Sequence, residues 1–211
     1  TYTTGNNGQI NAGQYDVTVT ADTNTVNDNY DITVVGGSMT ITKATTPAGA
    51  ITIGDAEGDN LSKTYDGKTF STSPVVQGPE KNVTLADGDY EYIDAKGNVV
   101  TDPVSAGDYQ VKLTQSGIDK VTSANSDYDL GDLSGIISKV TINKAKATVT
   151  VTSDDDITYD GKAHSLDVVT KGAVNGETIT YTTSDNSYTN VGKYAVTATA
   201  DNDSVNSNYD I

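Results

Sequence analysis

The sequence contains no cysteine, no tryptophan and no arginine, and it has a single histidine, His164. Without cysteine, neither a disulfide nor a thiolate metal site can form. The 13 cationic residues are all lysines, and they face 29 aspartates and glutamates, so the formal net charge is −16. Phosphate binding needs clustered cationic side chains, which argues against a nucleic-acid partner and against an anionic membrane surface. We expect the excess of acidic groups to keep the protein soluble.

Long apolar runs are also missing, and none approaches the roughly 20 residues of a transmembrane helix. No signal peptide or anchoring segment is recognised, so we expect the chain to be a piece of a longer polypeptide. Hydrophobic residues make up only 35% of it. Instead it has 33 threonines and 13 tyrosines, types that favour a pleated, half-buried surface. The composition therefore predicts small β-modules rather than one large core.

The same phrases recur along the chain. NAGQYDVTVTADTNTVNDNYDI at 11–32 and NVGKYAVTATADNDSVNSNYDI at 190–211 align without a gap, and 14 of their 22 positions are identical. SAGDYQVKLT at 105–114 is a third copy of the opening phrase. TYDGK occurs at 64–68 and 158–162, and the closing phrase appears as MTITKA at 39–44 and VTINKA at 140–145. The order within one unit is YDGK, GxYxV, NYDI and TITKA, with a period near 85–100 residues, which marks an array of bead-like domains.

The phrases divide the chain into three repeats. Residues 1–43 are the C-terminal half of a first module, 44–144 a complete second module, and 145–211 a third module that lacks its last strand. Almost no linker separates them, because the closing strand runs through Lys-Ala directly into the next module. We therefore expect a stiff, extended array. We also expect the incomplete third module to have an open sheet edge, where a strand such as 39–43 of a neighbouring chain would pair by strand swapping.

Apolar residues alternate with polar ones along several segments. In GQYDVTVTA at 13–21, Tyr15, Val17 and Val19 share one face and threonines the other, which is typical of an antiparallel sheet with one wet side. Clusters of Gly, Asn, Asp and Ser lie between these segments and indicate turns. No segment has a convincing helical period, and we expect at most one short turn, at 134–139. The prediction is an all-β fold of tandem immunoglobulin-like β-sandwich modules, with β-grasp-like modules as the alternative.

The GxYxV phrase supports the sandwich. In immunoglobulin-like domains, a tyrosine near the start of strand F precedes an inward-facing residue by two positions, and its hydroxyl bonds back to the preceding turn. Tyr15, Tyr109 and Tyr194 suit this tyrosine corner. Val17, Val111 and Val196 would then face inward, and the closing TITK strand would be strand G.

The repeated phrases, taken together and in their order, resemble the MBG or YDG-type repeat modules of Gram-positive surface adhesins, particularly mucus-binding proteins of lactic acid bacteria. The resemblance rests on KTYDGK, ITYDGK, SAGDYQV, NVGKYAV, NYDI, MTITKA and VTINKA. The resemblance covers the whole chain. It implies a secreted protein attached to the cell wall, adherence to host mucin or glycans, and no catalytic activity. The only alternative function that we retain is a passive structural stalk with no ligand of its own.

The YDGK phrase is the leading candidate for a ligand contact. Asp-Gly is a strong turn dipeptide, because glycine supplies positive φ without steric cost. A turn with its tyrosine packed on the sheet is the simplest interpretation. The functional alternative is a ligand-facing loop, in which Tyr65 and Tyr159 stack on a sugar while Asp66 and Asp160 accept hydrogen bonds from its hydroxyls.

Three other chemistries are weaker. Calcium prefers six to eight oxygen ligands, and acidic residues gather at 154–156 and at Asp87, Asp89, Glu91 and Asp94, although nothing matches an EF-hand loop. A covalent link from Lys43 or Lys144 to an asparagine such as Asn143 would need a buried lysine. Enzyme activity lacks support, because no nucleophile, base and stabiliser can be assembled around the single histidine. We therefore expect no enzyme and no required cofactor.

Overall fold

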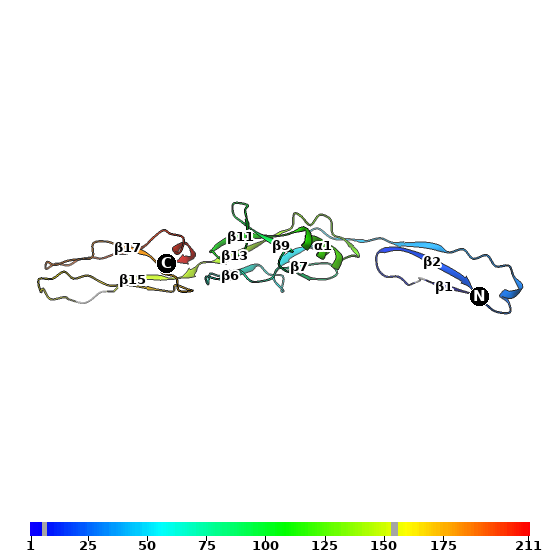
Figure 1. The fold of residues 1–211 in the computed structure, drawn as a ribbon, viewed down its shortest axis with the longest axis horizontal. Coiled ribbons are helices and arrows are strands. Elements are labelled where there is room, and N and C mark those ends of the chain that lie inside the picture. The colour runs from blue at the N-terminus through cyan, green and yellow to red at the C-terminus, as the bar shows by residue number, and fades with distance from the viewer. Residues whose placement is uncertain (6–7, 153–155) are drawn as a thin grey trace. The chain divides into compact units, whose positions relative to one another are not determined.

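A computed structural model describes residues 1–5, 8–152 and 156–211. The chain divides into two compact units, and each of them gathers segments that are distant in sequence. The first unit comprises Thr1–Gly58, Pro74–Tyr90 and Leu113–Ile136. The second comprises Asp59–Ser73, Glu91–Lys112 and Ile137–Ile211. The two units are described separately below, with the elements labelled as in Figure 1.

The first unit opens with a three-stranded antiparallel sheet in the order β1-β2-β3. Its strands are β1 (Tyr2–Gly5), β2 (Gly13–Ala21) and β3 (Gly37–Ile41), and Figure 1 shows the long β2 beside β1. Exposure alternates residue by residue along β2, as the Tyr-x-Val-x-Val pattern predicts for a sheet with one wet side. The 3₁₀-helix η1 (Asn27–Asn29) lies between β2 and β3.

The rest of the first unit has short strands and one helix. The strands β5 (Thr52–Gly54), β7 (Val75–Gln77) and β8 (Val83–Thr84) form an antiparallel sheet, and β4 (Ala44–Thr45) pairs in parallel with β12 (Tyr128–Asp129). The helix α1 (Gln115–Ala124) lies against β8. Val76, Leu85 and Val121 are almost wholly buried, so the helix contributes to the core of this unit.

The helix α1 corrects the prediction that no helix would form. The side chain of Thr114 caps its first turn by accepting a hydrogen bond from the Gly117 amide, at 3.4 Å, as N-cap threonines do. Only Gly117 and Val121 are buried within the helix, which is too sparse a pattern to stand out in the sequence. The single turn expected at 134–139 is also wrong for its second half, because residues from Ile137 onward belong to β13.

The second unit contains a five-stranded mixed sheet in the order β10-β9-β11-β13-β6. Its strands are β6 (Leu61–Thr64), β9 (Tyr90–Asp94), β10 (Val99–Val100), β11 (Gly107–Leu113) and β13 (Ile137–Asn143). The closing strand β13 is antiparallel to β11 on one side and parallel to β6 on the other. Val111 and Val140 are fully buried, and Leu61 and Ile142 are 1% exposed, so these strands form the core.

The remainder of the second unit consists of strand pairs. β14 (Ala145–Lys146) is parallel to β19 (Tyr209–Asp210), while β15 (Thr148–Val151) with β16 (Val168–Lys171) and β17 (Tyr181–Thr183) with β18 (Ala198–Ala200) are antiparallel. The 3₁₀-helix η2 (Asn206–Asn208) precedes β19. Figure 1 shows β15 and β17 in this part of the chain.

The structure is mostly β, with several small sheets and a single α-helix in the described residues, so the all-β prediction is confirmed. The finer immunoglobulin-like arrangement, with β-grasp-like modules as its alternative, stays a prediction. Among the described residues, no helix is long and apolar enough to cross a membrane.

Candidate functional site

The tyrosine of each GxYxV phrase closes a local loop. In all three copies its hydroxyl donates a hydrogen bond to the backbone carbonyl four residues earlier. The pairs are Tyr15 with Asn11 at 3.0 Å, Tyr109 with Ser105 at 2.9 Å, and Tyr194 with Asn190 at 3.0 Å. This is the bond that a tyrosine corner makes, although the assignment to an immunoglobulin strand F stays a prediction.

Both YDGK phrases form the same turn. A side-chain oxygen of Asp66 accepts from the backbone amide of Lys68 at 3.0 Å, and Asp160 accepts from Lys162 at 2.9 Å. The glycine between them has φ of 70° in the first turn and 76° in the second, a left-handed conformation that glycine adopts without strain. The pKa of the aspartate lies below its usual range in both turns. The largest cause at Asp66 is a hydrogen bond from the Lys63 ammonium, with the Lys68 amide second, and the largest cause at Asp160 is the Lys162 amide.

The two tyrosines of these turns lie in opposite surroundings. Tyr65 is 4% exposed, whereas Tyr159 is 63% exposed. The Tyr65 ring meets Tyr209 edge to face, with ring centroids 5.5 Å apart. Its hydroxyl donates to one oxygen of Glu177, and the Tyr209 hydroxyl donates to the other at 2.5 Å. The predicted ligand contact at Tyr65 is therefore covered by residues of the next repeat.

Burial and the Glu177 carboxylate both raise the pKa of the Tyr65 and Tyr209 hydroxyls. Desolvation is the first cause that raises the pKa of Tyr65, and the hydrogen bond to Glu177 is the second. The same two causes raise the pKa of Tyr209. Because Glu177 accepts from both hydroxyls, losing either proton would place a second negative charge beside the carboxylate.

The backbone of the turn also contacts side chains of the next repeat. The Asn175 side chain donates to the Gly67 carbonyl at 3.3 Å, and a Cβ on Gly67 would lie 2.7 Å from the Cβ of Asn175. Nearby, the Ala106 amide donates to the side-chain oxygen of Asn208 at 2.8 Å. We call the contacts of Tyr65, Gly67 and Ala106 with Asn175, Glu177, Asn208 and Tyr209 the repeat joint.

Part of the repeat joint occurs a second time, in the first unit. There the Ala12 amide donates to the side-chain oxygen of Asp127 at 2.7 Å. Ala12 and Ala106 hold the same place in the NAG and SAG phrases, and Asp127 and Asn208 the same place before Tyr-Asp. The parallel pairs β4–β12 and β14–β19 also correspond, since each joins the first strand of a repeat to its own Tyr-Asp phrase. The sequence interpretation missed Asn175, Glu177 and Asn208, although the recurring Asn/Asp before Tyr-Asp was a signal.

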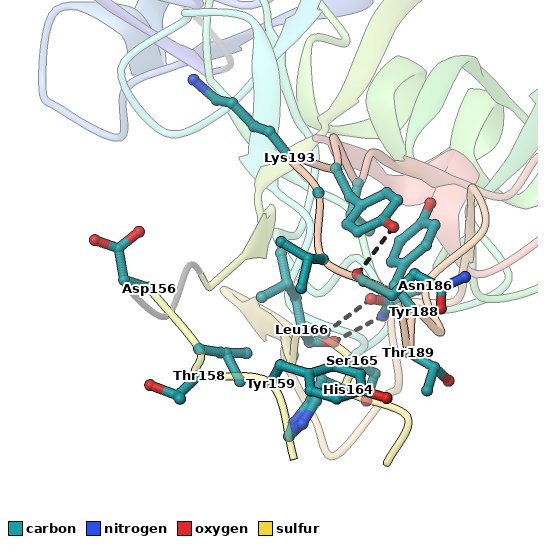
Figure 2. Close-up of a pocket in the computed structure, with 16 residues that line it drawn as sticks. Asp156, Thr158, Tyr159, His164, Ser165, Leu166, Asn186, Tyr188, Thr189 and Lys193 are labelled. Carbon is teal, nitrogen blue, oxygen red and sulfur yellow. Dashed lines mark hydrogen bonds between the residues drawn. The ribbon is translucent and has the colours of Figure 1, made fainter. Parts of the chain in front are cut away.

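The third repeat has an open pocket beside its own YDGK and GxYxV phrases, which in the second repeat take part in the repeat joint. It has a volume of about 490 Å³ and is lined mainly by residues of 156–159, 164–166 and 188–194. Figure 2 shows Tyr159, His164 and Tyr188 at this pocket, while the ammonium of Lys193 extends away from it. Val191, the counterpart of Ala106, is 85% exposed. The surface that is covered in the second repeat is thus open in the third.

Hydrogen bonds fix the walls of this pocket. The side-chain amide of Asn186 makes two 2.8 Å bonds to the backbone of Leu166, one to the N–H and one to the carbonyl (Figure 2). The Tyr188 ring stacks on Tyr194, with centroids 3.9 Å apart and planes 11° apart. His164 Nε2 lies 2.9 Å from Asp160 Oδ1. The pocket is therefore a shaped surface rich in tyrosine and backbone polar groups.

Three of the acidic residues considered for calcium, Asp89, Glu91 and Asp94, are paired with protein groups. Asp89, which is 7% exposed, binds the ammonium of Lys120 at 2.7 Å, and Glu91 binds Lys112 at 2.7 Å. Asp94 accepts from the amides of Lys96 and Asn98. Asp154 and Asp155 lie outside the described residues. Within the described residues, no cluster of three potential metal ligands occurs. Calcium binding stays a prediction.

The structure does not provide the buried lysine that the covalent link would need. Lys43 and Lys144 are both exposed, and so is Asn143. The burial that would desolvate a lysine and make its amine nucleophilic is therefore missing at both positions.

Two matches to family models show the protein family to which the chain belongs. The model described as MBG domain matches residues 52–144, and a second model with the same description matches residues 147–210. The chain belongs to the MBG domain family. No curated protein and no solved structure matches it significantly. MBG domains are binding modules and not a family of enzymes.

Proposed function

We propose that this MBG chain is part of the repeat region of a secreted, cell-wall-attached adhesin of a Gram-positive bacterium. It would hold an adhesive surface away from the cell and contribute weak contacts of its own to host mucin or glycans. The MBG matches over residues 52–144 and 147–210 carry this proposal. Because tethered modules raise each other's effective concentration, weak contacts in successive repeats would add up to firm adherence.

The candidate ligand contacts are the exposed members of the YDGK turns. Tyr159 is 63% exposed, and its ring lies at the open pocket beside His164. The side chains of Asp160 and Asp66 are 44% and 51% exposed. A tyrosine face and a carboxylate acceptor suit a sugar ring with its hydroxyls, so Tyr159 and Asp160 are the residues we propose first.

A passive stalk is the second candidate, and the burial of Tyr65 supports it. In the second repeat the YDGK tyrosine serves the repeat joint instead of facing a ligand. If every internal repeat used its tyrosine in this way, the array would only position other parts of the protein.

Binding of the full chain to immobilised mucin separates the two candidates. We expect saturable binding that persists at physiological salt, and we expect Tyr159→Ala to weaken it several-fold. Tyr30→Ala is the matched control, because Tyr30 is 70% exposed but lies outside both YDGK turns. Absence of binding would leave the stalk as the function of these repeats.

A further inference from the structure

The repeat joint includes an asparagine that is followed directly by glycine, Asn175 before Gly176. Asn175 has a φ of 53° and Gly176 a φ of 75°, and the Glu177 amide donates to the Val174 carbonyl at 3.0 Å. Two successive left-handed residues closed by this bond form a type I′ turn, for which Asn-Gly is a preferred sequence. The turn lies between β16 and β17, outside the hydrogen-bonded ladders of the sheets.

This turn exposes the groups that take part in asparagine deamidation. A backbone nitrogen can attack the side-chain amide carbon of the asparagine before it, and the side chain of the attacking residue normally hinders the approach. Here the attacking residue is glycine, and even a Cβ added to Gly176 would meet nothing within 4 Å. Asn175 and Gly176 are both exposed, so water and hydroxide reach them. Sterics and access to solvent therefore both favour the reaction at this pair.

Other asparagines of the chain lack one or both of these conditions. Asn175 is the one asparagine of the described residues that precedes a glycine. Asn125 and Asn206 are 0% and 5% exposed. The side-chain amide of Asn186 is held by its two 2.8 Å bonds to the backbone of Leu166. The reaction should therefore select Asn175.

We propose that Asn175 is a site of spontaneous deamidation that loosens the repeat joint. The Gly176 nitrogen forms a bond to Cγ of Asn175, the bond from Cγ to Nδ2 breaks, and ammonia leaves with the proton of the Gly176 amide. The product of this step is a cyclic succinimide. Water then opens the ring at either carbonyl, returns a proton to the Gly176 nitrogen and leaves aspartate or isoaspartate. Water is the only co-reactant, and no atom is oxidised or reduced.

Either product removes a contact of the joint. The Asn175 side chain donates to the Gly67 carbonyl at 3.3 Å, whereas a carboxylate only accepts hydrogen bonds, so two acceptors would face each other. Isoaspartate also adds a main-chain carbon to the turn. Glu177, which binds the hydroxyls of Tyr65 and Tyr209, follows two residues later and has to shift with the longer turn.

Tryptic digestion supplies a test with internal controls. Cleavage after lysine releases residues 172–193, which contain Asn175, Asn186 and Asn190. The full chain is held at mildly alkaline pH, and fragment-ion mass spectrometry follows the replacement of NH₂ by OH at each asparagine. We expect Asn175 to convert at least several-fold faster than the other two, and to give isoaspartate as well as aspartate.

The variant Asn175→Asp reproduces one product and measures its effect on the joint. We expect a melting temperature a few degrees lower and faster hydrogen exchange of the Val174 amide, which donates to the Tyr209 hydroxyl at 3.0 Å. Asn202→Asp is the matched control, because it adds the same charge at an exposed asparagine outside the joint, and it should change neither quantity. The deamidated fraction of the unmodified chain, separated by its extra negative charge, gives the same comparison without a variant.

Two results would overturn the proposal. One is conversion of Asn175 in the folded chain no faster than that of Asn186. The other is a deamidated fraction, or an Asn175→Asp chain, with the same melting temperature and the same Val174 exchange as the Asn202→Asp chain. Selective conversion at Asn175 together with faster Val174 exchange would support it.

Discussion

The ring of Tyr65 packs edge to face against the ring of Tyr209, at an interplanar angle of 82°. The two residues belong to different sequence repeats, 44–144 and 145–211, and both hydroxyls bind the carboxylate of Glu177. One YDGK tyrosine is therefore a structural contact between repeats, while its counterpart Tyr159 faces solvent. This difference between two copies of one motif provides matched controls within a single chain.

The hydroxyl of Tyr65 should matter for stability, and that of Tyr159 should not. Tyr65→Phe removes one of the two donors to Glu177 in a buried setting, so we expect a loss of about 1–2 kcal/mol in the free energy of unfolding. Tyr159→Phe should change it by less than about 0.5 kcal/mol, because the ring is exposed. Urea unfolding of the two variants measures this. Equal effects would mean that the repeat joint does not form as described.

Stability should fall at alkaline pH. Burial and Glu177 raise the pKa of Tyr65 and Tyr209 above the ordinary value of about 10. The unfolded chain then loses these protons at a lower pH than the folded chain. The stabilisation is therefore complete below about pH 10 and is lost as the pH rises through the folded pKa.

Phenolate absorbance and unfolding measured across this pH range check the prediction together. The Tyr65→Phe/Tyr209→Phe double variant should lose stability less steeply above pH 10 than the unmodified chain does. It should also lack the latest part of the phenolate titration. If the double variant lost stability with pH as steeply as the unmodified chain, Tyr65 and Tyr209 would not be the cause of the alkaline loss of stability.

The side chain of Asn208 should tolerate only another acceptor. Its oxygen receives the Ala106 amide, and Asp127 does the same for Ala12. Asn208→Asp should therefore retain most of the stability, whereas Asn208→Ala should cost about 1–3 kcal/mol, since it leaves a part-buried amide unsatisfied. Exchange of the Ala106 amide should accelerate only in the alanine variant. Similar losses in both variants would argue that the bond from the Asn208 side-chain N–H to the Ser204 carbonyl, and not the bond from Ala106, sets the requirement.

Stability at acidic pH should depend on Asp89. The Lys120 ammonium, the Ala86 amide and the Ser116 hydroxyl lower the pKa of Asp89 from 3.8 to about 2. A lowered folded pKa means that this contribution is complete above about pH 4 and is lost as the pH falls toward 2. Asp89→Asn should be less stable at neutral pH and show a shallower acid dependence in thermal melts. Lys120→Met should move the remaining dependence to higher pH, and an unaltered profile in both variants would contradict the assignment.

Gly117 should resist a substitution that normally stabilises helices. Alanine is favoured over glycine within a helix by about 1 kcal/mol. A Cβ on Gly117, however, would lie 2.0 Å from the carbonyl oxygen of Asp89, so Gly117→Ala should lower the melting temperature. Gly135→Ala is the control, since a Cβ there meets nothing within 4 Å, and it should be neutral or slightly stabilising. A stabilising Gly117→Ala would place α1 elsewhere than against Asp89.

The sequence predicted those features that depend on local pattern. Strict alternation in 13–21 predicted β2, and the Asp-Gly pairs predicted the two turns with positive φ. The helix α1 was missed because its stability comes from a Thr114 cap and from one close contact at Gly117, rather than from an apolar stripe.

The different fates of Tyr65 and Tyr159 could not be read from the motif. Both copies have the same local residues and the same turn. What covers Tyr65 is a pair of side chains more than 100 positions later in the chain, Glu177 and Tyr209. Single-sequence patterns carry no information about such distant partners, although the repeat order at least showed that adjacent modules had to meet.

The most direct measurement of the central claim is the binding of the full chain to immobilised mucin at physiological salt, with Tyr159→Ala and Tyr30→Ala measured beside it. The account predicts saturable binding that survives salt and is weakened several-fold by Tyr159→Ala only. Absence of binding, or equal binding by all three proteins, would contradict an adhesive role for the exposed YDGK turn.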